Sequence, residues 1–224
     1  MRQTNPIVFE LQKFQLRLDG VAVFPEISIQ LTAGELLVVM GPSGCGKSSL
    51  LAAIAGSSGS EFELYGKVIL QGRQLCDLPM ERRQIAIVYQ DDLLFPHLDV
   101  AGNLLFALAR GNAQERMHSV KRALASAGLA GFEKRDVATL SGGQRARVSL
   151  LRSLLAKPKL LLLDEPFSRL DAALRQDFRQ FVYSQIESMN IPALMVSHDR
   201  QDCPNSQFYA LQDAQMQMLN GGYV

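Results

Sequence analysis

The stretch that decides the fold is Gly41–Ser48, which reads Gly-Pro-Ser-Gly-Cys-Gly-Lys-Ser. The apolar run 36–40 precedes it, and residues 49–55 follow it with apolar side chains at helical spacing. A strand, a glycine-rich turn and a helix in this order gather backbone amides and the positive end of a helix dipole around one point. The stretch therefore predicts a loop that binds a phosphate group.

The residue types of this loop fit a nucleotide. Glycines have no Cβ and let the backbone approach an anion closely. Lys47 offers a charge for the β- and γ-phosphates, and the Ser48 hydroxyl is positioned for Mg²⁺. A glycine-rich turn without a ligand is the alternative, which the Gly-Lys-Ser ending and both flanks argue against. The residues predicted to bind the nucleotide are Gly41, Pro42, Ser43, Gly44, Cys45, Gly46, Lys47, Ser48 and Ser49.

Composition limits the classes of protein that remain. The length of 224 residues suits one large α/β domain, or a domain with a subdomain. Hydrophobic residues make up 47% and charged residues 20%, which permits a sizeable core. The net charge of +1 gives no electrostatic argument for nucleic acid as a partner.

The compartment follows from what the sequence lacks. No apolar run approaches the length of a membrane span, and the first six residues do not resemble a signal peptide. Cys45, Cys76 and Cys203 show neither metal-ligand spacing nor a disulfide framework. We expect a reducing, cytoplasmic location in which contact with a membrane goes through another protein.

Periodicity predicts an α/β core with two additions. Alternating segments in 7–31, with Asp19-Gly20 as a hairpin turn, and a second hairpin in 68–75 predict a small antiparallel sheet before and after the loop. Residues from about 91 to 155 have helical patterns and predict a helical insert. The expected helices are one capped by Asp99, one at 115–129 and one at 144–155. Buried strands are expected at 85–89, 160–163 and 193–197, a helix at 172–189 and a weak strand at 208–211.

Four polar residues follow apolar strands, at the sheet edge where open α/β sheets bind ligands. They are Gln90, Asp164, Glu165 and His198. Asp164 is positioned to hold Mg²⁺ beside Ser48, and Glu165 to polarise the water that attacks the γ-phosphate. The amide oxygen of Gln90 offers a ligand to the metal or to that water, and His198 a hydrogen bond to the γ-phosphate.

Each of these residues has an ordinary structural alternative. An acidic pair after a strand is often a helix cap, a single Gln is usually on the surface, and a single His is more often structural than catalytic. Taken singly, Gln90 and His198 favour that alternative. Their order after a phosphate-binding loop favours the functional interpretation.

A second anion site is predicted at Leu140–Gln144, where a Ser-Gly-Gly turn opens a helix. Its expected binding residues are Ser141, Gly142, Gly143 and Gln144. One nucleotide does not need two such sites on one chain. The arrangement is explained if the second site serves a nucleotide held by another copy.

These motifs together resemble the ATP-binding subunits of ABC transporters, over nearly the whole chain. Gly41–Ser48 resembles the Walker A motif, Gln90 the Q-loop and Leu140–Gln144 the signature motif. Leu160–Glu165 resembles Walker B, Ser168–Asp171 the D-loop and His198 the H-loop. The resemblance implies a P-loop NTPase (RecA-like) core with an N-terminal antiparallel β subdomain and an inserted α-helical subdomain, in a single ABC domain over residues 1–224.

The resemblance also implies partners and cofactors. Two copies are expected head to tail, with ATP and Mg²⁺ between the Walker A motif of one chain and the signature motif and Asp171 of the other. Asp92–Leu98 resembles the segment of import-type subunits that receives a transmembrane permease, and a solute-binding protein is expected indirectly. The expected location is the inner face of the cell membrane. The chain ends soon after His198, so we expect no C-terminal regulatory domain.

Two positions depart from the family pattern. Leu18 stands where members often carry an aromatic residue that stacks on adenine, with Phe14 and Phe24 as imperfect substitutes, which predicts weak base selectivity. Arg169 stands where alanine is usual in the D-loop, and adds charge at the expected dimer interface.

The sequence thus predicts an ATPase that powers transport, with import favoured over export. A soluble ABC-type ATPase is the first alternative, although the long coiled-coil insert or second cassette typical of that class is lacking. A P-loop kinase would have no use for Leu140–Gln144. A nucleotide switch without turnover is disfavoured by Glu165. No residue identifies the cargo, because the membrane subunits of this family choose it.

Overall fold

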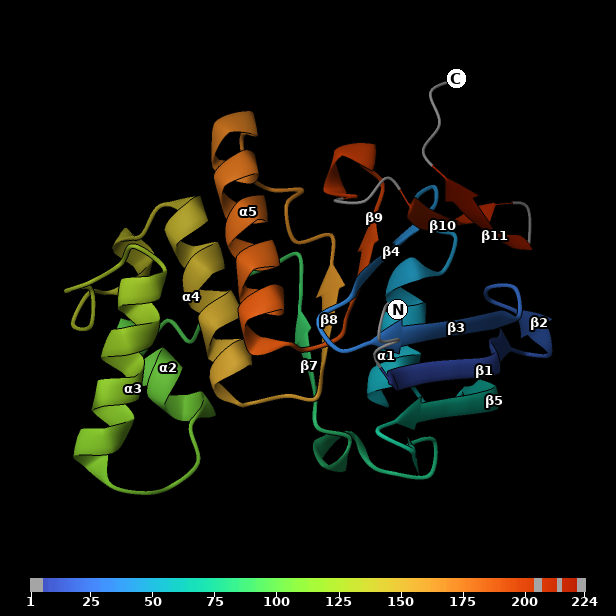
Figure 1. Cartoon of the computed structure of the whole chain (residues 1–224), viewed down its shortest axis with the longest axis horizontal. Helices are drawn as coiled ribbons and strands as arrows, with labels where there is room; N and C mark the ends of the chain where they lie inside the picture. Colours follow the sequence, from blue (N-terminus) through green and yellow to red (C-terminus); the bar gives the residue numbers. More distant parts are fainter. Residues whose placement is uncertain (1–5, 204–206, 213–214, 221–224) are drawn as a thin grey trace, which may run out of the picture. The chain divides into compact units, whose positions relative to one another are not determined.

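The structure is a computed structural model that describes residues 6–203, 207–212 and 215–220 (Figure 1). The chain divides into two compact units, each of which is described by itself. The first unit comprises Met1–Ile87, Lys159–Glu165 and Gln185–Val224. The second comprises Val88–Pro158 and Pro166–Ser184.

An antiparallel sheet, sheet A, forms the first part of the first unit. Its longest strand, β1 (Ile7–Leu18), pairs with β5 (Phe62–Leu70) on one side and with β2 (Val21–Ala22) and β3 (Ile27–Thr32) on the other. The short strand β6 (Arg73–Gln74) pairs with β5. The predicted turn at Asp19-Gly20 and the hairpin within 68–75 are confirmed.

The second sheet of this unit, sheet B, contains the predicted buried strands. Its order is β11-β10-β4-β9-β8-β7, and β10, β4, β9 and β8 run parallel to one another. Strands β8 and β9 are buried at almost every residue, which explains their unbroken apolar sequences. The bounds are β4 Leu36–Met40, β7 Ile85–Val88, β8 Leu160–Asp164, β9 Ala193–Ser197, β10 Gln207–Gln212 and β11 Gln215–Asn220.

Helix α1 (Lys47–Ala55) follows the phosphate-binding loop and joins the two sheets. Leu50, Leu51 and Ile54 belong to one core cluster with apolar residues of β1, β3, β5, β8 and β9. From Leu50 to Ala55 the helix is apolar on all sides, as expected for a helix inside a core. Because its packing is fixed by both sheets, the loop at its N-terminus has a fixed direction.

Four helices make up most of the second unit (Figure 1). They are α2 (Val100–Ala107), α3 (Ala113–Ser126), α4 (Gly142–Leu155) and most of α5 (Ala172–Met189). Asp99 caps α2 by accepting a hydrogen bond from the amide of Gly102, as the sequence predicted. Short 3-10 turns lie at Met80–Arg82, Val137–Thr139 and Arg200–Asp202.

Two sequence expectations need correction in detail, and one strand was missed. Strand β7 ends at Val88 instead of at residue 89, and three of its four residues are only half-buried because it closes one edge of sheet B. Helix α3 starts two residues before the predicted 115 and ends at Ser126, ahead of Gly128 with φ 70°. Strand β11 was not predicted.

No described helix combines the length and apolarity that crossing a membrane requires.

A buried arginine connects α1 with the segment before β7. Arg83 is 4% exposed, and its guanidinium donates to the carbonyls of Ala53 and Ile54 at 3.1 and 2.9 Å. It also donates to the carbonyls of Cys76 and Leu78 at 3.1 and 2.9 Å. The last carbonyls of a helix lack partners within the helix, so this cation satisfies them and complements the negative end of the dipole.

We expect Arg83→Met to lower the free energy of unfolding by about 3 kcal/mol, because it leaves buried carbonyls without donors. Urea denaturation followed by circular dichroism measures this. Arg82 is the matched control, since it is exposed, and Arg82→Met is expected to change the free energy little. An equal loss in both variants would show that the bonds of Arg83 do not carry the effect.

Candidate functional site

Strand register brings the predicted residues of the first unit to one sheet edge. Met40 pairs with Ser197 across β4 and β9, and Asp164 pairs with Val196 across β8 and β9. The three strands are parallel, so they end at the same edge. The loop beginning at Gly41 and His198 directly follow those ends, and the acidic pair consists of the last residue of β8 and the residue after it.

The phosphate-binding loop has the geometry its glycines allow. Gly46 has φ 90° and is the N-cap of α1, where no side chain supplies a capping bond. A Cβ on Gly46 would lie 2.8 Å from the carbonyl oxygen of Val23, so only glycine fits there without displacement. The first amides of α1 thus remain available to an anion, which is the property that a helix N-terminus needs to bind phosphate.

The side chain of Lys47 is held by the loop itself. This side chain is 6% exposed, and Nζ donates to the carbonyls of Gly41 and Pro42 at 2.8 and 2.9 Å. Nζ also lies 3.8 Å from Oε1 of Glu165. The loop therefore holds the ammonium group in place, at a point where it can meet a phosphate.

Ser48 and Asp164 meet directly. The hydroxyl of Ser48 donates to Oδ1 of Asp164 at 3.0 Å. Burial raises the pKa of the Asp164 carboxyl, the charge of Glu165 adds to this, and the bond from Ser48 and the charge of Lys47 oppose it. The carboxylate of Asp164 and the hydroxyl of Ser48 together offer hard oxygen ligands of the kind that Mg²⁺ prefers.

Glu165 and His198 form the last part of this cluster. Nδ1 of His198 lies 3.0 Å from Oε2 of Glu165. The amide of Glu165 donates to the carbonyl of Val196 at 3.0 Å, and its φ is 44°, in the left-handed region. Left-handed backbone is uncommon outside glycine and clusters at functional sites. The first unit therefore brings together Lys47, Ser48, Asp164, Glu165 and His198.

The other predicted residues belong to the second unit. Gln90 is exposed and lies two residues beyond the end of β7. Oδ1 of Asp171 accepts a hydrogen bond from the amide of Leu174 at 3.0 Å, so this residue caps α5. Their participation in one site with residues of the first unit stays a prediction.

The signature segment forms a capping box. Ser141 is the N-cap of α4, and its hydroxyl accepts from the amide of Gln144 at 3.3 Å. Oε1 of Gln144 accepts from the amide of Ser141 at 3.0 Å. These bonds do not use the amides of Gly142 and Gly143, which lie in the first turn of the helix. Beside them lies a hollow of about 360 Å³, lined also by Leu174 and Phe178.

Ion pairs around Gln90 were not foreseen from the sequence. Asp91 pairs with Arg169, and Asp92 with Arg145 at 3.3 Å. Burial raises the pKa of Asp92, and the charge of Arg145 opposes this. The unusual Arg169 thus has a partner within its own unit.

The two aromatic residues that the sequence suggested as substitutes for Leu18 are buried. Phe14 and Phe24 are 0% and 2% exposed, and their rings stack at 6.0 Å. Neither presents a face to a ligand, so both are wrong as substitutes for Leu18, which is 39% exposed. Phe62 is the cross-strand partner of Leu18 and is half-buried. Opposite residues of an antiparallel pair share a face, so this ring was missed because only the pairing reveals it.

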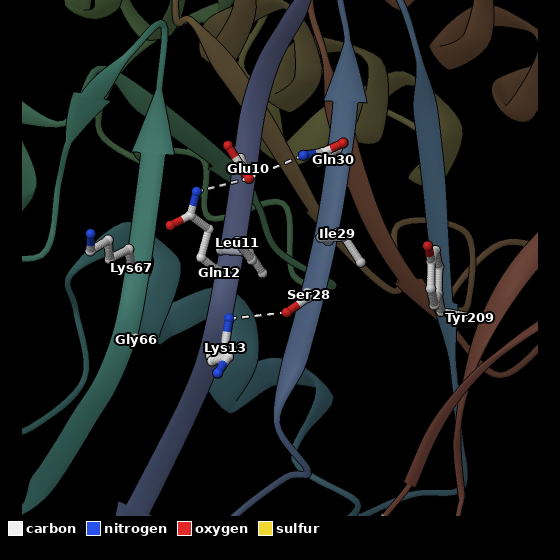
Figure 2. A pocket seen from close by; sticks show the side chains of 10 residues that line it. All are labelled: Glu10, Leu11, Gln12, Lys13, Ser28, Ile29, Gln30, Gly66, Lys67 and Tyr209. Atoms are coloured by element: carbon white, nitrogen blue, oxygen red, sulfur yellow. Dashed lines mark hydrogen bonds between the residues drawn. The ribbon is translucent and has the colours of Figure 1, made fainter.

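A larger hollow on the first unit is separate from these residues. It lies over β1, β3 and β5 (Figure 2). Its volume is about 740 Å³. Its polar groups bond one another: Gln12 and Gln30 both donate to Glu10, at 2.9 and 3.1 Å, and the amide of Lys13 donates to Ser28 at 3.0 Å. None of the residues that line this hollow belongs to the phosphate-binding loop.

Comparison with known proteins agrees with this geometry. The family model described as ABC transporter matches residues 24–168. The chain belongs to the ABC transporter family. It is 47% identical over 197 residues to the uncharacterized ABC transporter ATP-binding protein YnjD of Escherichia coli K12, which covers 87% of this chain and 90% of that protein.

Other relatives are longer. The spermidine/putrescine import ATP-binding protein PotA of Mesoplasma florum is 37% identical over 87% of this chain and 55% of its own length. The Fe(3+) ions import ATP-binding protein FbpC of Photorhabdus laumondii is 36% identical over 99% of this chain and 61% of its own length. The chain thus spans little more than half of these import proteins. It is an ATP-binding subunit of the family, an ATPase coupled to transport.

The pKa shift of Asp164 predicts a stability change. A carboxyl whose pKa is higher in the folded than in the unfolded chain destabilises the fold when it is ionised. This loss of stability is absent below the pKa of the carboxyl in the unfolded chain, about 3.9. We therefore expect Asp164→Asn to raise the melting temperature at pH 7.5 by about 2 °C, without metal or nucleotide, and the gain to shrink toward pH 4. Differential scanning fluorimetry measures it, with exposed Glu81→Gln as control. A lower melting temperature at pH 7.5 would contradict the prediction.

Proposed function

We propose that this chain powers import, as a head-to-tail pair of copies that hydrolyses ATP beneath transmembrane permease subunits. The observation that carries the proposal is the convergence of Lys47, Ser48, Asp164, Glu165 and His198 at one sheet edge. We further infer that sheet B with α1 is a RecA-like core, sheet A its antiparallel β subdomain, and the second unit its helical subdomain, within one ABC domain.

Mg²⁺ fits the donor set of the first unit. Ser48 and Asp164 would hold it, and we propose Gln90 of the second unit as a further oxygen ligand. Bound there, the ion would neutralise charge on the β- and γ-phosphates. The pKa of Asp164, raised by burial, supports this assignment because a cation would stabilise the buried carboxylate.

Each residue then has one chemical role. The backbone amides of the loop around Gly44–Lys47 and the ammonium of Lys47 bind the β- and γ-phosphates. Glu165 accepts a proton from a water molecule while the oxygen of that water bonds to the γ-phosphorus. The bond between the γ-phosphorus and the bridging oxygen of the β-phosphate breaks in the same step. His198 is held by Glu165 and donates to the γ-phosphate oxygens. A base held at this point contributes roughly 10²–10⁴-fold to the rate.

We expect Glu165→Gln to keep ATP binding and to lower turnover at least 100-fold, because the amide cannot take the proton while the phosphate loop is unchanged. Steady-state phosphate release and equilibrium binding of labelled ATP measure the two quantities. Glu187→Gln, an exposed change on α5, is the matched control and should leave both unchanged. Turnover within twofold of wild type would remove Glu165 from this role.

The second anion site supports a shared active site. The first-turn amides of α4 lie in the second unit, and the first unit already has a complete phosphate loop of its own. We propose that Ser141, Gly142, Gly143 and Gln144 of one copy close over ATP held by Gly41–Ser49 of the other. Asp171 lies at the start of α5, where we propose that it faces the same interface.

A mixed dimer tests this arrangement. In a pair of wild type with the double variant Lys47→Ala, Ser141→Arg, shared sites leave both sites damaged, since the variant chain contributes one defective motif to each. We therefore expect near-zero ATP hydrolysis by dimers purified through two different tags. With separate sites the wild-type copy would keep its own, and about half of the activity would contradict sharing.

Import is supported by the relatives. Several of them are named import ATP-binding proteins, for spermidine/putrescine or for Fe(3+) ions. We propose that Asp92–Leu98 receives a permease subunit at the cytoplasmic face of the membrane, and that a solute-binding protein delivers cargo to the permease without touching this chain. Export and a soluble ATPase outside membranes are the alternatives. Reconstitution with co-encoded permease subunits, followed by uptake into ATP-loaded vesicles, distinguishes them.

A further inference from the structure

The residues around His198 hold its backbone in one conformation. His198 directly follows β9, and its side chain is 56% exposed. An exposed ring reaches Glu165 reproducibly only if the turn beneath it is fixed, because an open turn spreads over many conformations. The residues that fix this turn are buried beneath it.

Ser197 uses its hydroxyl in two directions. It is 2% exposed, and its Oγ accepts a hydrogen bond from the amide of Asp199 at 3.0 Å. That bond spans His198, so the histidine is the central residue of a serine turn. The same hydroxyl donates to Oδ2 of Asp202 at 2.5 Å.

Asp202 determines the direction of these bonds. Its side chain is 4% exposed, and its Oδ2 accepts the hydrogen bond of the Ser197 hydroxyl. The proton of Ser197 must therefore point to Asp202, which leaves an oxygen lone pair for the amide of Asp199.

A short helical turn keeps Asp202 in place. Asp199 caps Arg200–Asp202 by accepting from the amide of Gln201 at 2.9 Å. The amide of Asp202 donates back to the carbonyl of Asp199 at 3.1 Å. On the other side, Ser197 pairs with Met40, directly before the phosphate loop. The turn is thus closed at both ends, with His198 at its exposed apex.

We propose that Ser197 and Asp202 are positioning residues for ATP hydrolysis. Asp202 orients the hydroxyl of Ser197, and that hydroxyl holds the turn that presents His198 to Glu165 and to the γ-phosphate. The inference rests on the proposed role of His198. Both side chains are buried, so we expect both to act on the rate through His198 and to leave the binding of ATP to the phosphate loop.

The first test separates rate from binding in the purified full chain. Ser197→Ala and Asp202→Leu should lower kcat about tenfold, since small displacements of a reacting group have effects of that order or larger. KM for ATP should stay within twofold. Ser197→Thr keeps the hydroxyl and should restore kcat. Ser188→Ala, whose exposed hydroxyl bonds the carbonyl of Gln185 within its own helix, is the matched control. A change in KM with unchanged kcat would overturn the proposal.

The second test is a double-mutant cycle with His198→Ala, measured as single-turnover hydrolysis. If Ser197 acts through the histidine, Ser197→Ala should slow His198→Ala no further. A further tenfold loss would overturn the inference while leaving the role of His198 intact. An unchanged rate in His198→Ala itself would instead refute the proposed role of His198. Should Ser197→Ala and Asp202→Leu fail to fold, Asp202→Asn and Ser197→Thr decide, since only the former should lower kcat.

Discussion

The register of three parallel strands is the constraint on which the site depends. Pairing of Met40 with Ser197 and of Asp164 with Val196 ends β4, β8 and β9 at one level. Backbone hydrogen bonds set this level, and the buried side chains of these strands prevent slippage by one residue, which would turn an apolar set away from the core. The phosphate loop, the acidic pair and His198 are thereby aligned before any of their side chains meet.

Much of this was accessible from the sequence, because local rules and tertiary structure agree. Four consecutive leucines before Asp164 predict a strand buried on both faces, and Asp99 and Ser141 predict helix starts that capping bonds confirm. The edge of sheet B was less accessible. The sequence of β7 looks like that of a central strand, and only the order of the sheet shows that it is half-buried.

What the sequence did not reveal depends on pairing between distant residues. Phe62 becomes a neighbour of Leu18 only through the register of β1 and β5, and Arg83 reaches the end of α1 from 29 and 30 residues away. Ser197 and Asp202 are close in sequence, yet a serine at the end of a strand and an acid in a polar turn have no pattern of their own. Their burial marks them, and burial is a property of the fold.

The backbone of Glu165 has a geometric consequence for the two carboxylates. Successive residues of a strand point to opposite faces of the sheet, so Asp164 and a regular residue after it would diverge. With φ at 44°, Glu165 leaves this alternation while its amide still bonds β9. Asp164 reaches Ser48, and Glu165 reaches Lys47, which directly precedes Ser48. The left-handed backbone of Glu165 thus lets both carboxylates contact consecutive residues at the start of α1.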